Sequence, residues 1–289
     1  MIKGILSPFL GKYLIGMLVI ICGFAQFVAC GTQLYRVSVE DDHDRATVSK
    51  SNPDAANPKA ATYGIHSISG WEKLPIAFRF GADLSYEQKL QLIAAIKTWE
   101  WAVGRNLFVY EGIHENTTGD SFDDLYSSLD DEINGHYGDR NWKKTAKPEK
   151  VLATTIWKNN GSQSQINRAD IRFNEEFYVI GDSLVLAGED DKPVVDMQSL
   201  ALHELGHLLG LSHVDESVDE MSVMNPTLFV GEGLTYRYLS RGDIERIQMI
   251  YGCRNASCDI DTLLDEAQDN EFSGRLTLAA KAWISTENP

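Results

Sequence analysis

The sequence predicts an α+β domain in which a mixed, twisted sheet packs against two long helices and a C-terminal helix. Three observations lead to this fold class. A strand, a long helix and a second strand follow one another between residues 74 and 110. A second long helix is predicted at 197–209, and a capped final helix at 240–251. The chain has 289 residues, which is enough for one good-sized domain with additional segments.

The first strand–helix–strand unit is indicated by its residue pattern. Apolar side chains alternate along 74–80, as expected of a half-buried strand. Ser85 and Gln88 have the spacing of a capping box, and Gly104 follows the last apolar position of the helix. A second strand is predicted at 107–110. Two strands joined by a long helix are expected to pair in parallel.

The segment 111–150 interrupts this pattern and is predicted to be an insertion. It is acidic in its first half and basic in its second half, which is typical of a solvated surface excursion. Its acidic half would also allow a calcium loop, although the ligand spacing of an EF-hand is missing. His114 and His136 are interpreted as surface residues, and Ca²⁺ is kept as an additional candidate cofactor.

Three further strands are predicted after the insertion, at 151–157, 169–174 and 183–187. The last of these is assigned to the edge of the sheet. An antiparallel edge strand over a cleft can bind an extended peptide by main-chain pairing. The segment 183–187 is therefore predicted to bind a peptide substrate.

The helix predicted at 197–209 carries the residues with the clearest chemical pattern. His203 and His207 are four residues apart, so their rings project from one face of the helix. Gly210 lets the chain leave the helix through a backbone angle that a side chain would resist. His213 can then return as a third ligand. Glu204 lies one step around the helix, near the two rings.

These residues predict a catalytic zinc site. Three neutral imidazoles can hold one Zn²⁺ and leave a fourth tetrahedral position open for water. Glu204 is the predicted general base that acts on this water. The alternative is a core helix whose histidines are merely hydrogen-bonded. Gly210 and His213 argue against it, because a pattern of two histidines and one glutamate recurs by chance more readily than the full motif.

The N-terminus is predicted to be an export signal, residues 1–29. Lys3 and Lys12 precede an apolar run at 14–25. The residues Phe27-Val28-Ala29-Cys30 resemble a bacterial lipobox, in which the signal is cut before the cysteine and that cysteine is acylated. The resemblance implies a lipid anchor on Cys30 at the cell envelope, with an outer-membrane destination because glycine follows. A membrane span and plain secretion are the alternatives.

The polar segment 30–69 is predicted to be a flexible linker, followed by the catalytic domain at 70–253 and a tail of unknown role at 254–289. The formal net charge is −16 without a Lys/Arg cluster, which disfavours nucleic acid and anionic membrane surfaces as partners. Cys253 and Cys258 are close enough in sequence for a local disulfide in an oxidising compartment. Two free thiols are the alternative.

The pattern His-Glu-x-x-His-x-x-Gly-x-x-His resembles that of the metzincin metalloproteases. Three other segments resemble the matrixin branch of that group: 195–202, the Met-turn at 223–226, and the last helix at 239–252. The resemblance extends over about residues 71–252. It implies a zinc endopeptidase that acts on a protein or peptide substrate, with Met224 beneath the metal.

The sequence also departs from the matrixin pattern. The sulfhydryl propeptide motif is missing, as is the histidine cluster of a second, structural zinc, so one catalytic Zn²⁺ is predicted. Leu228 stands where those enzymes usually carry a tyrosine on the specificity-pocket wall, which leaves substrate preference open. Two alternative functions are a catalytically silent surface-binding lipoprotein on the same scaffold, and a hydrolase of cell-wall peptide crosslinks.

Overall fold

A computed structural model describes residues 35–38, 64–129, 131–159, 165–188, 192–253, 258–267 and 279–283. All of them belong to one compact unit, Tyr35–Pro289. The predicted export signal, Cys30 and much of the predicted linker and tail lie outside the described residues. In the described part of the chain, no helix is both long and apolar enough to cross a membrane.

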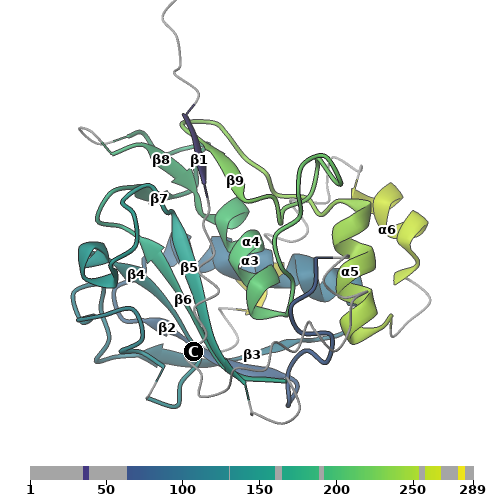
Figure 1. Ribbon diagram of the computed structural model, residues 1–289, viewed down its shortest axis with the longest axis horizontal. Coiled ribbons are helices and arrows are strands. Elements are labelled where there is room, and N and C mark those ends of the chain that lie inside the picture. The colour runs from purple at the N-terminus through teal and green to yellow at the C-terminus, as the bar shows by residue number, and fades with distance from the viewer. Residues whose placement is uncertain are drawn as a thin grey trace, which may run out of the picture. The chain divides into compact units, whose positions relative to one another are not determined.

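A five-stranded mixed sheet forms one layer of the domain (Figure 1). Its strands follow the order β3-β2-β4-β6-β5. Strands β3, β2, β4 and β6 run parallel to one another, whereas β5 at the edge runs antiparallel to β6. The strands are β2 (Ile76–Gly81), β3 (Phe108–His114), β4 (Gly135–Asp139), β5 (Ala153–Asn159) and β6 (Ile166–Asn174). The predicted α+β class with a mixed sheet is confirmed.

Two long helices, α3 (Tyr86–Val103) and α4 (Met197–Leu208), pack against each other next to this sheet (Figure 1). The capping box of Ser85 and Gln88 starts α3, and Gly104 ends it with a φ of 64°. Trp99 Nε1 donates to the Leu202 carbonyl at 3.0 Å and so ties the two helices together. This packing positions α4.

Every residue of α4 is buried, including its charged and polar ones. The helix contacts α3 on one side and β5 and β6 on the other, so it has no solvent face. Asp196 caps its N-terminus, since the Asp196 side chain accepts from Ser199 N. The side chains of α4 are therefore held on several sides by protein.

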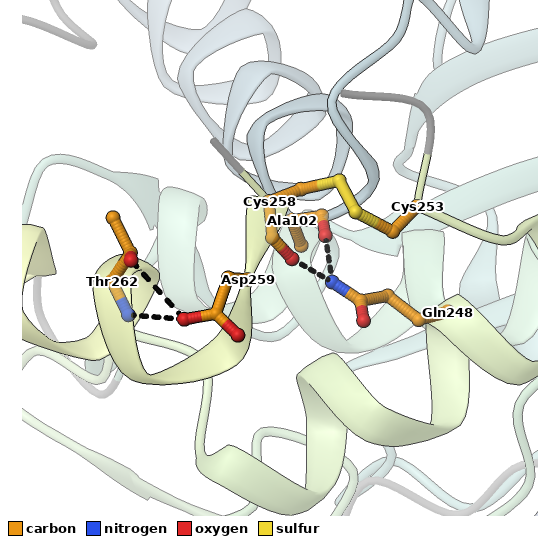
Figure 2. Close-up of a disulfide and its surroundings, with 6 residues drawn as sticks. All are labelled: Ala102, Gln248, Cys253, Cys258, Asp259 and Thr262. Carbon is orange, nitrogen blue, oxygen red and sulfur yellow. Dashed lines mark hydrogen bonds between the residues drawn. A yellow bond between two sulfur atoms is a disulfide. The ribbon is translucent and has the colours of Figure 1, made fainter. Parts of the chain in front are cut away.

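The C-terminal helix α5 (Arg241–Tyr251) begins with a capping box of Ser240 and Asp243. A disulfide joins Cys253, just after this helix, to Cys258 (Figure 2). Gln248 Nε2 donates to the carbonyls of Ala102 at 2.7 Å and Cys258 at 2.8 Å. These bonds connect α3, α5 and the segment that leads into the short helix α6 (Ile260–Ala267).

The expectation of an edge strand at 183–187 is wrong. The chain forms the short strand β7 (Val179–Gly181), which pairs with β8 (Val194–Asp196), and then turns at 183–185. The turn is closed by the Asp182 carbonyl, which accepts from the amides of Val185 and Leu186. Leu184 and Val185 consequently project into solvent. The antiparallel strand at the sheet edge is β5 instead.

The segment 111–150 is more than a surface excursion. It completes β3, contributes β4 to the centre of the sheet and forms a short 3₁₀ helix, Trp142–Thr145. Trp142 and His136 are fully buried. The interpretation of His136 as a surface residue is therefore wrong, because a charge-rich sequence conceals a five-residue strand that pairs on both sides.

The described parts of the predicted linker lie against the domain. Strand β1 (Tyr35–Ser38) pairs antiparallel with β9 (Thr227–Val230). Farther along, Ile65 is buried and forms a β-bridge with Leu211, directly after the zinc-motif helix. Residues 64–69 thus belong to the packed domain rather than to a tether.

Candidate metal centre

Three histidine side chains converge at the C-terminal end of α4. His203 and His207 project from the helix, and Gly210, with a φ of 111°, lets the chain turn back so that His213 faces them. His203 Nε2 lies 2.9 Å from His207 Nε2 and 3.2 Å from His213 Nε2. Within the described residues, these three form the one group of nitrogen, sulfur or carboxylate donors spaced for a metal ion.

Backbone carbonyls orient two of the rings. His203 Nδ1 lies 2.7 Å from the Val223 carbonyl, and His207 Nδ1 lies 2.8 Å from the Leu211 carbonyl. A carbonyl only accepts, so each Nδ1 carries the proton and each Nε2 presents a lone pair. A metal-ligating imidazole needs this tautomer and this fixed orientation.

The three donors fit a zinc ion. Tetrahedral ligands at a Zn–N distance of about 2.0–2.1 Å lie roughly 3.3 Å from one another. The observed separations of 2.9 and 3.2 Å from His203 Nε2 are close to this spacing. Burial, followed by the neighbouring His207, lowers the pKa of His203 well below its usual value, so the ring stays neutral. Neutral imidazole is the form that binds metal.

Met224 packs directly under this part of α4. Its side chain is fully buried, and a Cβ added to Gly206 would lie 2.3 Å from Met224 Sδ. Gly206 is therefore required for the close approach of the Met-turn to the helix between the two histidine ligands. Gly206 occupies a variable position of the motif, and the motif alone does not show what packs against it.

The Met-turn is held by the last helix. Asp243 is fully buried at the start of α5. Its Oδ1 accepts from Ser222 Oγ at 2.6 Å, and its Oδ2 accepts from Val223 N at 2.9 Å. Since the Val223 carbonyl orients His203, a chain of short contacts runs from α5 to the metal centre. The residue that caps the final helix therefore also holds the turn whose carbonyl orients His203.

Glu204 lies in the same buried helix, with a relative exposure of 1%. Thr155 of β5 is fully buried, and its Oγ1 lies 2.6 Å from Glu204 Oε2 and 3.0 Å from the Glu204 carbonyl. The carboxylate is the shorter contact and the stronger acceptor. Thr155 was missed from the sequence, because a threonine in a strand gives no signal of what it faces.

A cavity of about 220 Å³ opens beside His203. His203 forms part of its wall, together with Glu216 and Glu220 from the segment after His213. Leu228 of β9 and Tyr236 complete its apolar surface. The cavity therefore reaches from the metal centre to an acidic wall.

One comparison with known proteins matches the part of the chain that contains the three histidines. Residues 122–252 match the family described as Matrixin. Metalloendoproteinase 2-MMP of Arabidopsis thaliana is 48% identical over 58 residues, which cover 20% of this chain and 14% of that protein. Matrilysin of Felis catus is 44% identical over 63 residues, 22% of each chain. Matrix metalloproteinase-26 of Homo sapiens is 44% identical over 61 residues, 21% of this chain and 22% of that protein. The matches span no more than about a fifth of these relatives.

Proposed function

We propose that this chain, a matrixin-like metzincin by its match over residues 122–252, is a zinc-dependent endopeptidase. One observation carries the proposal: three imidazole nitrogens converge, and Glu204, next in sequence to His203, is buried on the helix that carries two of them. When bound by His203, His207 and His213, zinc would supply Lewis acidity to a water molecule and to the scissile carbonyl.

Glu204 is assigned the proton transfers. Its carboxylate accepts a proton as water attacks the carbonyl carbon, and it delivers that proton to the amine nitrogen as the C–N bond breaks. Thr155 Oγ1 donates to Glu204 Oε2 and fixes the rotamer of the carboxylate. Burial of Glu204 excludes competing solvent from the carboxylate.

Strand β5 is the proposed platform for the substrate backbone. It is the last strand of the five-stranded sheet, and it carries Thr155 at the position that contacts Glu204. An extended peptide that pairs with the outer edge of β5 passes the glutamate and the histidines. This arrangement suits cleavage within a peptide chain.

The test combines zinc content with turnover of a protein substrate such as casein. A zinc chelator is expected to stop cleavage, and added Zn²⁺ to restore it. Glu204→Gln should lower kcat at least a hundredfold while zinc content is unchanged, because only the general base is lost. Full proteolysis by Glu204→Gln would refute the assignment.

Export and lipidation of Cys30 form part of the same proposal. The disulfide between Cys253 and Cys258 supports it, since such bonds persist in oxidising compartments. Metabolic labelling with a fatty acid should mark the wild-type chain in the cell envelope. Label that persists in Cys30→Ser would contradict acylation at this residue.

A further inference from the structure

The cavity beside His203 has an acidic wall with apolar sides. Glu216 and Glu220 both line it, and no lysine or arginine whose side chain the structure describes does so. Met221 and Leu228 also line it and offer the apolar contact surface. A cavity lined by two glutamates and by apolar side chains matches a long side chain with a cationic tip.

The segment that carries the two glutamates is fixed in place. Glu216 Oε1 accepts from Thr227 Oγ1 at 2.8 Å, which ties this residue to β9. The Glu220 carbonyl accepts from Asn225 Nδ2 at 2.9 Å and from the Tyr236 hydroxyl at 3.3 Å. The side chain of Glu216 and the backbone of Glu220 are therefore held in place at the cavity wall.

Nearby carboxylates affect the titration of Tyr236, a residue that lines the cavity. The pKa of Tyr236 is raised, first by burial and then by the charges of Asp243, Glu220 and Asp219. The molecule as a whole carries a formal net charge of −16, which further favours a cationic ligand over an anionic one.

The geometry points to a lysine or arginine side chain of the substrate, next to the scissile bond, as the occupant of this cavity. The assignment rests on the proposed endopeptidase function. His203 belongs to both the metal centre and the cavity wall, so a substrate residue in the cavity adjoins the bond that is cleaved. The aliphatic stem lies along Met221 and Leu228, and the cation meets Glu216 and Glu220.

The test measures binding separately from cleavage. The full chain, loaded with zinc and carrying Glu204→Ala, is titrated with fluorescent peptides that differ only by lysine or norleucine on either side of the scissile bond. Lysine should bind roughly tenfold more tightly at low salt, and this advantage should shrink as salt is raised. In Glu216→Gln/Glu220→Gln the ratio should fall to within about twofold.

Glu87→Gln/Glu245→Gln is the matched control, because it removes the same two charges from exposed positions on α3 and α5 that do not line the cavity. Its affinity ratio should equal that of the parent chain. Equal affinity for the two peptides, or a lysine preference that persists in the double variant, would overturn the assignment. Absence of cleavage by the chain that retains Glu204 would refute the endopeptidase function instead. The ratio of the affinities for the lysine and norleucine peptides would still decide which side chain the cavity prefers.

Discussion

His203 in α4 and His136 in β4 are both almost completely buried, with relative exposures of 2% and 0%. Their surroundings differ. His203 Nδ1 has the Val223 carbonyl as its acceptor, and its Nε2 faces two other imidazoles. His136 stacks on Phe78 with ring centroids 4.9 Å apart, and neither of its nitrogens has a hydrogen-bond partner in the described part of the chain.

The difference indicates which surroundings suit a buried histidine to bind a metal ion. Burial lowers the pKa of both rings, so neutrality alone does not distinguish them. A carbonyl that fixes the tautomer, together with neighbouring donors at coordination distance, does distinguish them. His136 has neither, and it fills the sheet face as an aromatic side chain.

Replacing His203 or His136 by leucine should give the largest difference, because zinc binding and proteolysis are expected to depend on His203 and not on His136. His203→Leu removes a central donor and is expected to lower zinc affinity and proteolysis by more than about a hundredfold, since loss of outer partners alone costs 10–100-fold. His136→Leu should keep full zinc content and activity. Metal analysis of the purified chains provides the measurement. Loss of zinc from His136→Leu would break the comparison.

The second prediction concerns Thr155, the partner of Glu204. Thr155→Val keeps the shape of the side chain but removes the donor to Glu204 Oε2. A hydrogen bond to a charged group is worth about 1.5–3 kcal/mol, so kcat should fall roughly ten- to hundredfold while KM and zinc content change little. Thr155→Ser retains the hydroxyl and should recover most of kcat. If serine and valine were equally impaired, the bond would have no positioning role.

The contrast between His203 and His136 also shows which features of the site can be predicted from the sequence and which cannot. The spacing of His203, His207 and His213 predicted their convergence, because helix geometry and one glycine determine where the rings go. The capping boxes of α3 and α5 were likewise predictable, since they are local. His136 and Thr155 were not, because their roles depend on strand pairing and on residues about 35 and 49 positions away.

The third prediction tests the floor of the metal centre. Gly206→Ala would place a Cβ 2.3 Å from Met224 Sδ, so it should destabilise the fold by about 1–3 kcal/mol through overpacking. Combining it with Met224→Ala should recover part of this loss, because the contact is then removed. Urea unfolding of the four chains measures the coupling. Additive effects would show that the two side chains do not meet.

The smallest expected effect is the loss of stability in acid that the buried His136 causes. Burial lowers the pKa of His136 to about 3, whereas the unfolded ring titrates near its ordinary value of about 6.5. Between these values the unfolded chain binds a proton that the folded chain does not, so stability falls as pH falls. Relative to His136→Leu, the wild type should lose about 1 kcal/mol between pH 6.5 and pH 5.5.

The buried Asp170 makes stability change with pH in the opposite direction to His136. Its effect cancels when the wild type is compared with His136→Leu. Burial raises the pKa of Asp170 to about 7, so its contribution to stability is present at low pH and is lost as pH rises from about 4 to 7. Both chains contain Asp170, and the difference between their urea unfolding free energies therefore isolates the histidine. If the difference in unfolding free energy between the two chains stayed constant from pH 6.5 to 5.5, His136 would gain a proton in the folded state as it does in the unfolded state. The distinction between the two buried histidines would then rest on the metal centre alone.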